Sequence, residues 1–218
     1  MAHNNNVTST SRDDNRLAPF NPTHESSIDV AIDLLQLQSA DILFDLGCGD
    51  GRMIIRAASR VDGLRCVGIE LDESLVARGR DMAIAISSAH KAALADRIEI
   101  LNGDVLADLN RLGQPAPATE DISGEQRSNH ELALLDDATA VFVYLLPQGL
   151  KKVKLLLEEA AKRRRREQTN GAGIGAVDNE MKQPALKVAS YMFSIPGWNP
   201  VQVDRSGKGS CPIYLYHL

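Results

Sequence analysis

Short apolar runs alternate with amphipathic stretches along the first half of the chain. The run ILFDL at residues 42–46 is closed by glycines, which is typical of a strand buried inside a protein. The stretches on either side of it carry apolar residues at helical spacing. This alternation of strand and helix predicts an open parallel α/β sheet with right-handed crossovers. The predicted elements are helices over 26–37, 52–60 and 72–94, and strands over 42–46, 65–70 and 98–101.

The alternation breaks after the third predicted strand. Residues 112–137 contain two glycines, two prolines and six acidic residues but one arginine, so they predict a mobile acidic insertion. We expect a second flexible insertion over 167–184 and a disordered leader over 1–18, which leaves a single domain over 19–218. The basic run at 162–166 indicates a solvated helix end. The remaining predicted elements are strands over 138–146 and 186–193, a helix over 149–166, and a hairpin of 201–204 with 213–217.

Composition narrows the class of protein. The chain has 218 residues, of which 44% are hydrophobic and 24% charged, as in an ordinary globular domain. Its net charge of −5 argues against a nucleic-acid partner, which calls for a basic surface. The polar N-terminus is not a secretory signal, and no apolar run is long enough to span a membrane. Three scattered cysteines favour a cytoplasmic protein, with the nucleus and the mitochondrion left open. The histidines show no metal-ligand spacing, so no metal site is expected.

The strongest local signal is the glycine-rich segment DLGCGDGR at residues 45–52, which follows a predicted strand and opens a predicted helix. Glycines there let the backbone turn tightly and approach a ligand closely. The dinucleotide fingerprint is G-x-G-x-x-G, and here Arg52 stands where its third glycine would be, which disfavours a nicotinamide dehydrogenase. A pyrophosphate would also be repelled by Asp50. The loop acid suits a cofactor with a cationic end.

Two further acidic residues follow the next two predicted strands. Glu70 ends the second strand, about 20 residues after the loop, where a carboxylate can accept both hydroxyl groups of a ribose. Asp104, in the sequence Asn102-Gly103-Asp104, directly follows the third strand and can accept a hydrogen bond from an adenine amino group. Together with the glycine loop, these residues predict a cofactor that contains adenosine.

In their order and spacing, DLGCGDG, GIELD and NGD resemble the class I S-adenosylmethionine-dependent methyltransferases. The resemblance covers about residues 19–218 without the two insertions. It implies a Rossmann-like, doubly wound sheet of seven strands, mostly parallel, with an antiparallel strand in the C-terminal hairpin. It also implies S-adenosylmethionine as cofactor, S-adenosylhomocysteine as product, and a set of cofactor-binding residues. Those expected at the methionine end are Asp45, Gly47, Cys48, Gly49, Asp50 and Gly51; Glu70 and Leu71 are expected at the ribose, and Asp104 and Val105 at the adenine.

A narrower resemblance is carried by PFNPT at residues 19–23, by DLGCGDGR, and by VYLLP at residues 143–147. These segments are similar to a group of small methyltransferases that includes the lysine methyltransferases of mitochondrial inner-membrane proteins. The likeness implies methylation of a protein lysine, although the membrane-anchoring segment of the mitochondrial members is absent. VYLLP also differs from the Asn/Asp-Pro-Pro-Tyr/Phe of methyltransferases that act on amino groups of DNA or glutamine.

The predicted topology places residues 144–148 at the cofactor crevice, because the fourth strand ends there. Tyr144 is therefore the candidate for orienting an amine acceptor, by its hydroxyl or its ring. Residues 20–23, including Thr23, are expected to fold over the cofactor as a lid, and Cys48 is expected to fill the loop without acting as a nucleophile. A small molecule or RNA as acceptor, and a non-catalytic methyltransferase-like subunit, remain alternatives. The oligomeric state is open.

Overall fold

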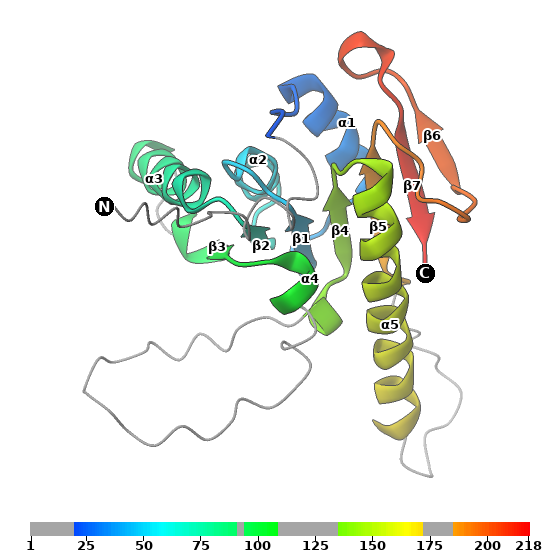
Figure 1. Cartoon of the computed structure of the whole chain (residues 1–218). Coiled ribbons are helices and arrows are strands. Elements are labelled where there is room, and N and C mark those ends of the chain that lie inside the picture. Colours follow the sequence, from blue (N-terminus) through cyan, green and yellow to red (C-terminus); the bar gives the residue numbers. More distant parts are fainter. Residues whose placement is uncertain (1–19, 91–93, 109–134, 172–184) are drawn as a thin grey trace, which may run out of the picture.

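The computed structural model describes residues 20–90, 94–108, 135–171 and 185–218. Its centre is a seven-stranded sheet in the order β3-β2-β1-β4-β5-β7-β6 (Figure 1). The first five strands run parallel, and β7 lies antiparallel between β5 and β6, which confirms the predicted fold class. The strands are β1 (Ile42–Leu46), β2 (Arg65–Glu70), β3 (Ile98–Asn102), β4 (Ala140–Val143), β5 (Lys187–Tyr191), β6 (Gln202–Asp204) and β7 (Ile213–His217).

Helices cover both faces of this sheet (Figure 1). Because successive side chains of a strand point to opposite faces, Leu43 packs with the α1–α2–α3 layer and Phe44 with the layer formed by α5. Both side chains are fully buried, so β1 has two covered faces, as its continuous apolar run predicts. The helices are α1 (Glu25–Leu35), α2 (Arg52–Arg60), α3 (Glu73–His90), α4 (Val105–Asp108) and α5 (Pro147–Gly171), with short 3-10 turns η2 (Ala95–Arg97), η3 (Leu135–Asp137) and η4 (Lys208–Ser210).

The fourth strand is shorter than the sequence predicts. Strand β4 ends at Val143, which pairs with Leu46, the last residue of β1. Tyr144 and the residues after it therefore leave the sheet at its carboxyl edge. The order of the strands reverses at β1, because β2 lies on one side of it and β4 on the other. In open α/β sheets such a switch point forms a crevice at the carboxyl ends of the strands.

The basic run at 162–166 differs from its prediction. Helix α5 continues to Gly171, so the run lies inside the helix and the first residues of the predicted insertion 167–184 are helical. Arg164 is buried and donates to the carbonyl oxygen of Ala138, while Arg163 Nε donates to Asp136 Oδ2 at 2.7 Å. The run thus anchors η3 and the start of β4. Residues 1–18 of the predicted leader, residue 19 of the predicted domain, and residues 112–134 and 172–184 of the predicted insertions lie outside the described residues.

Ion pairs join α1 to α2. Asp29 accepts from Arg56 through both carboxylate oxygens at 2.7 Å and from Arg60 at 3.0 Å. Arg60 also donates to Asp33 at 2.7 Å. Bidentate pairing of this kind fixes orientation as well as distance. Because α2 begins directly after the glycine loop, α1 and the residues before it are held in register with that loop.

Gly68, in the middle of β2, makes room for the glycine loop. A β-carbon at this position would lie 2.6 Å from Cys48 Sγ and 2.9 Å from Ile54 Cδ1. We expect Gly68→Ala to lower the free energy of unfolding by about 2 kcal/mol, as overpacking of a tight core does. Chemical denaturation measures this change. Adding Cys48→Ala removes the sulfur and should restore part of the loss, whereas equal stability of wild type and Gly68→Ala would contradict the packing argument.

Candidate functional site

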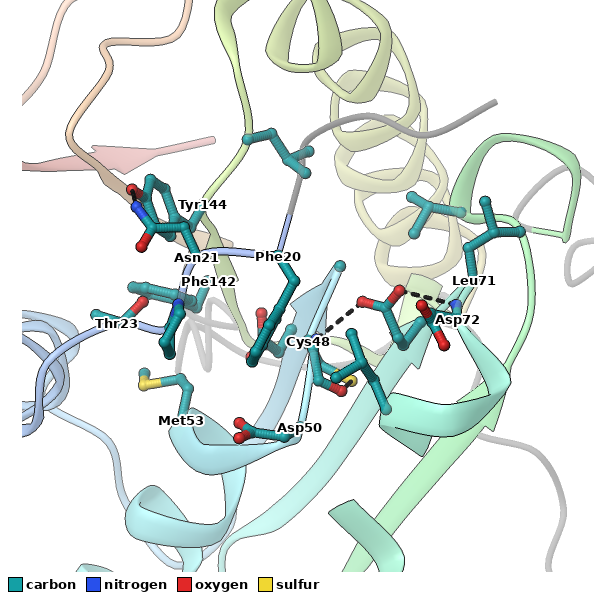
Figure 2. Close-up of a pocket in the computed structure, with 18 of the residues that line it drawn as sticks. Phe20, Asn21, Thr23, Cys48, Asp50, Met53, Leu71, Asp72, Phe142 and Tyr144 are labelled. Atoms are coloured by element: carbon teal, nitrogen blue, oxygen red, sulfur yellow. Dashed lines mark hydrogen bonds between the residues drawn. The ribbon is translucent and has the colours of Figure 1, made fainter. Parts of the chain in front are cut away.

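A cavity opens at the switch point, at the carboxyl ends of the parallel strands (Figure 2). Its walls come from the loop after β1, the end of β2, the turn after β3 and the residues that follow β4 and β5. The segment 20–23, which precedes α1 in the chain, lies across it. All of the predicted site residues line this cavity apart from Gly51. Gly51 has a φ of 72° at the N-cap of α2, where it turns the chain into the helix.

The glycine loop needs glycine for two separate reasons. Gly47 and Gly49 have φ angles of 86° and 56°, in the left-handed region that side chains rarely adopt. In addition, a β-carbon on Gly49 would lie 2.7 Å from the ring of Phe20. The loop is tied to β2, since the backbone nitrogens of Gly47 and Cys48 donate to the carbonyl oxygen of Ile69 at 2.9 and 3.1 Å.

Glu70 joins two backbone segments of the cavity wall (Figure 2). Its Oε2 accepts from the Gly49 nitrogen and its Oε1 from the Asp72 nitrogen, each at 2.9 Å. These bonds hold the side chain of Glu70 in one orientation at the end of β2. Each carboxylate oxygen has a second lone pair, so the group keeps acceptor capacity toward a ligand.

Asp50 is neutralised by the protein itself, which changes the role that the sequence suggested for it. The carboxylate is fully buried and accepts from Arg52 Nε and Nη2 at 2.8 and 2.7 Å, and Arg78 lies 3.6 Å away. Burial raises the pKa of Asp50, but the hydrogen bonds and charges of the two guanidinium groups outweigh it and leave the pKa below its ordinary value. Asp50 therefore has its own cation and does not depend on a ligand for one.

Asp45 is the acid whose charge the protein leaves unbalanced. Its side chain is 2% exposed, and no donor among the described residues reaches its carboxyl group. Burial, together with the negative charges of Glu70 and Asp50, raises the pKa of Asp45 to about 8. A cation placed beside this carboxyl would favour its ionised form. Asp45, rather than Asp50, is thus the loop acid suited to a positively charged ligand.

Asp104 and Val105 lie at the other end of the cavity, after β3. Asp104 Oδ1 accepts from the Leu106 nitrogen at 2.8 Å, in an arrangement typical of the start of a helix, and α4 begins at Val105. The side chain of Val105 is buried against the α5 side of the sheet. The same carboxylate thus caps α4 and borders the cavity.

Cys48 is not equipped to act as a nucleophile. Burial and the nearby charges of Asp45 and Glu70 raise the pKa of its thiol well above the ordinary value, and Sγ donates to the carbonyl oxygen of Gly49 at 3.8 Å. A thiol in this state is protonated at neutral pH. Its sulfur occupies the space beside Gly68 that a β-carbon there would need, so Cys48 packs the loop against β2.

Tyr144 lies in the part of the cavity formed by the residues after β4 and β5, on the other side of β1 from Asp104 (Figure 2). Its hydroxyl donates to Met192 Sδ at 2.9 Å and accepts from Asn21 Nδ2 at 2.8 Å. Its ring meets that of Tyr191 edge to face, with centroids 4.8 Å apart. Thr23 is buried in the same wall but does not cap α1, since His24 Nδ1 accepts from the Ser26 nitrogen at 3.3 Å.

Met192 and Phe193 at this end were missed by sequence reasoning, and Asn21 was predicted as part of the lid 20–23 but not as a partner of Tyr144. Asn21 and Met192 lie 123 and 48 residues from Tyr144 in the chain, so no local pattern connects them with it. Positive φ at a non-glycine residue, which Met192 shows at 65°, is likewise visible only in the structure.

Other kinds of site are not seen in the part of the chain that the structure describes. Over residues 20–90, 94–108, 135–171 and 185–218, no cluster of three or more histidine, cysteine or acidic side chains is suited to hold a metal ion. Within the same residues, no helix has the length and apolar character needed to cross a membrane.

No family model matches the chain, but known proteins match it over most of its length, among them the following two. A protein-lysine N-methyltransferase of Saccharolobus islandicus is 26% identical over 200 residues, which are 91% of this chain and 92% of that protein. The crystal structure of an RNA methyltransferase from Salinibacter ruber in complex with S-adenosyl-L-homocysteine superposes with a TM-score of 0.59 at 26% identity, over 90% of this chain and 93% of that one. Both relatives are methyltransferases, and the chain is similar to them over most of its length and has the seven-stranded sheet of the class I S-adenosylmethionine-dependent methyltransferases.

Proposed function

We propose that this enzyme transfers the methyl group of S-adenosylmethionine to the side-chain nitrogen of a protein lysine. The observation that carries the proposal is the division of the cavity into two unlike ends. Carboxylates gather around the glycine loop and the ends of β2 and β3, whereas the end around Tyr144 is lined by uncharged, mainly apolar side chains such as Phe142, Leu145 and Met192. The first end suits a cationic nucleoside cofactor and the second an uncharged amine.

The residues at the acidic end fit S-adenosylmethionine. The carboxyl group of Asp45 matches the ammonium of the methionine part, and the free lone pairs of Glu70 match the two ribose hydroxyls. Asp104 and Val105 would border the adenine. Glycines at 47 and 49 keep the loop free of side chains where the cofactor approaches.

The bound cofactor would supply an electrophilic methyl group on a sulfonium with a good leaving group. The chain's own contribution is alignment and exclusion of water. A lysine must attack as the free amine, and the apolar side chains at the acceptor end lower its pKa and favour loss of its proton to solvent. Its lone pair then forms the N–C bond while the electrons of the S–C bond stay on sulfur. The methylated nitrogen afterwards gives up a proton to solvent.

The charge of the cavity supports a cationic acceptor over RNA. Of the five acidic side chains in its walls, Asp45 has its pKa raised to about 8 and Asp50 is paired with Arg52, the one cationic side chain there; the other three are Glu70, Asp72 and Asp104. A ribose-phosphate backbone binds through basic groups, which these walls do not supply. An approaching lysine ammonium is attracted by the same charges. The lysine methyltransferase activity named for the Saccharolobus islandicus relative supports the same reading.

The test is incorporation of tritium from S-adenosyl[methyl-³H]methionine into a cell extract incubated with the purified enzyme. We expect the label in protein, sensitive to protease but not to ribonuclease, and recovered as methyllysine after acid hydrolysis. Tyr144→Phe should lower the rate about tenfold or more through loss of one hydrogen bond at the acceptor. The matched control is Tyr214→Phe, since Tyr214 does not line the cavity. Label recovered in RNA or in small molecules would overturn the lysine assignment.

A further inference from the structure

The hydroxyl of Tyr144 has its hydrogen-bonding capacity nearly used up by the protein. A tyrosine hydroxyl carries one proton and two lone pairs. The proton is donated to Met192 Sδ at 2.9 Å, and one lone pair accepts from Asn21 Nδ2 at 2.8 Å. What remains toward the cavity is a single lone pair. In this arrangement Tyr144 can accept a hydrogen bond from a substrate but cannot donate one.

Both partners of the hydroxyl are themselves held in place. Met192 has a φ of 65°, an uncommon backbone conformation for a non-glycine residue, and its backbone nitrogen donates to the carbonyl oxygen of Pro212 at 2.8 Å. Asn21 sits between Phe20, whose ring lies against Gly49, and the buried Thr23. The edge-to-face contact with Tyr191 restricts the phenol ring of Tyr144 as well. Figure 2 shows Asn21 reaching the Tyr144 hydroxyl from the segment that crosses the cavity.

We propose that Asn21 and Met192 are positioning residues: Met192 takes the proton of the Tyr144 hydroxyl and Asn21 fills one of its lone pairs, which leaves one acceptor lone pair and thereby selects an acceptor nitrogen that still carries an N–H. The inference rests on the proposed function, since it concerns how the lysine nitrogen is held there. A free primary or secondary amine donates an N–H to Tyr144 Oη and keeps its lone pair for the methyl carbon. A tertiary amine has no N–H to donate.

This selection sets how many methyl groups one lysine receives. The unmethylated and monomethylated amines can both be oriented by Tyr144, so mono- and dimethyllysine are the products. Dimethyllysine cannot be held in the same way and is a poor acceptor for a third methyl group. We expect the first two transfers to be at least about tenfold faster than the third, the factor that one hydrogen bond commonly supplies.

The hydrogen bonds can be tested without catalysis. In protein labelled with ¹³C-methyl methionine, the Met192 resonance is identified by its loss in Met192→Leu. We expect it to shift in Tyr144→Phe, which removes the bond to sulfur, and to shift less in Asn21→Ala. Ser26→Ala is the control from the adjacent first turn of α1, where the side chain contacts His24 and not Tyr144. An unmoved Met192 resonance in Tyr144→Phe would overturn the inference whatever the activity.

The distribution of methylated lysine products tests whether this hydrogen bonding limits the number of methyl groups transferred. The label that the enzyme transfers to cell-extract protein is separated into mono-, di- and trimethyllysine after hydrolysis. We expect little trimethyllysine from wild type, and a larger trimethyl share with a roughly tenfold lower kcat in Asn21→Ala and Met192→Leu, at an unchanged KM for the cofactor. Mainly trimethyllysine from wild type, or an unchanged product ratio in both variants, would overturn the inference. If no lysine is methylated, the proposed function fails and the inference falls with it, even where the Met192 shifts are seen.

Discussion

Replacing Glu70 with alanine is expected to weaken the binding of S-adenosylmethionine at least about 100-fold, which is about 3 kcal/mol of binding free energy. The substitution removes a carboxylate that faces the cavity, and with it the two hydrogen bonds that hold the backbone at Gly49 and Asp72. The variant therefore loses the contact of Glu70 with the ligand and also the support that Glu70 gives to the glycine loop. Isothermal titration calorimetry with S-adenosylmethionine and S-adenosylhomocysteine measures the change.

Two further variants sharpen this test: a control at the nearby Glu73 and a substitution of Glu70 that keeps its size. Glu73→Ala removes a similar charge three residues away, on the exposed first turn of α3, and should bind as wild type does. Glu70→Gln keeps the size of the side chain but turns one acceptor into an NH₂ donor, which then faces a backbone N–H. We expect it to bind nearly as weakly as Glu70→Ala. Tight binding by Glu70→Ala would remove Glu70 from the cofactor site.

The second large effect is expected from pH acting through Asp45. The pKa of this carboxyl is raised to about 8 by burial and by the charges of Glu70 and Asp50, so it is mostly protonated in the ligand-free protein at pH 7. Binding a cation there requires its ionisation. Affinity for S-adenosylmethionine should therefore fall by up to about tenfold for each pH unit below 8. Titrations at several pH values between 6 and 8 measure the slope.

The substitution Asp45→Asn removes this charge and leaves the other acidic side chains of the site unchanged. The variant should bind weakly with little pH dependence over the same range, because an amide does not titrate. The same substitution has an opposite effect on stability. A carboxyl whose folded pKa is raised stabilises the fold fully below its unfolded pKa of about 4, and this contribution is lost as pH rises through about 8. Asp45→Asn should thus unfold at a higher temperature than wild type at pH 8. If affinity and unfolding temperature depended on pH in the same way in wild type and Asp45→Asn, the assignment of this pH dependence to Asp45 would be contradicted.

The order of elements and the clustering of the glycine loop, Glu70 and Asp104 around one cavity could be predicted from the sequence because their signals are local. A buried strand, a glycine loop and a helix start follow one another within residues 42–60, and Glu70 and Asp104 each stand directly after a strand. In a parallel sheet the carboxyl ends of the strands meet at one edge. A prediction of parallel strands is therefore enough to predict that these residues lie near one another.

The contacts at the end of the cavity around Tyr144 could not be predicted in the same way, although Tyr144 and the segment 20–23 were expected near the crevice. Asn21, Tyr144 and Met192 come from three distant segments, and their contacts depend on where two strands end and on an unusual backbone conformation. The charge of the loop was also misassigned between its two acids. Only the structure shows that Arg52 turns back to pair with Asp50, which leaves Asp45 without a cation. A sequence gives the number of charges in a loop but not how they pair.

The ion pairs between α1 and α2 bear on how product leaves and fresh cofactor enters. Because Asp29 holds both Arg56 and Arg60, α1 is fastened to the helix that follows the glycine loop. Among the described residues, the segment that lies over the loop is 20–23, which leads directly into the start of α1. We expect the cavity to be uncovered by movement of these few residues, with α1 and α2 staying in place. Exchange can follow the nanosecond-to-microsecond motion of a short loop instead of the slower movement of a domain.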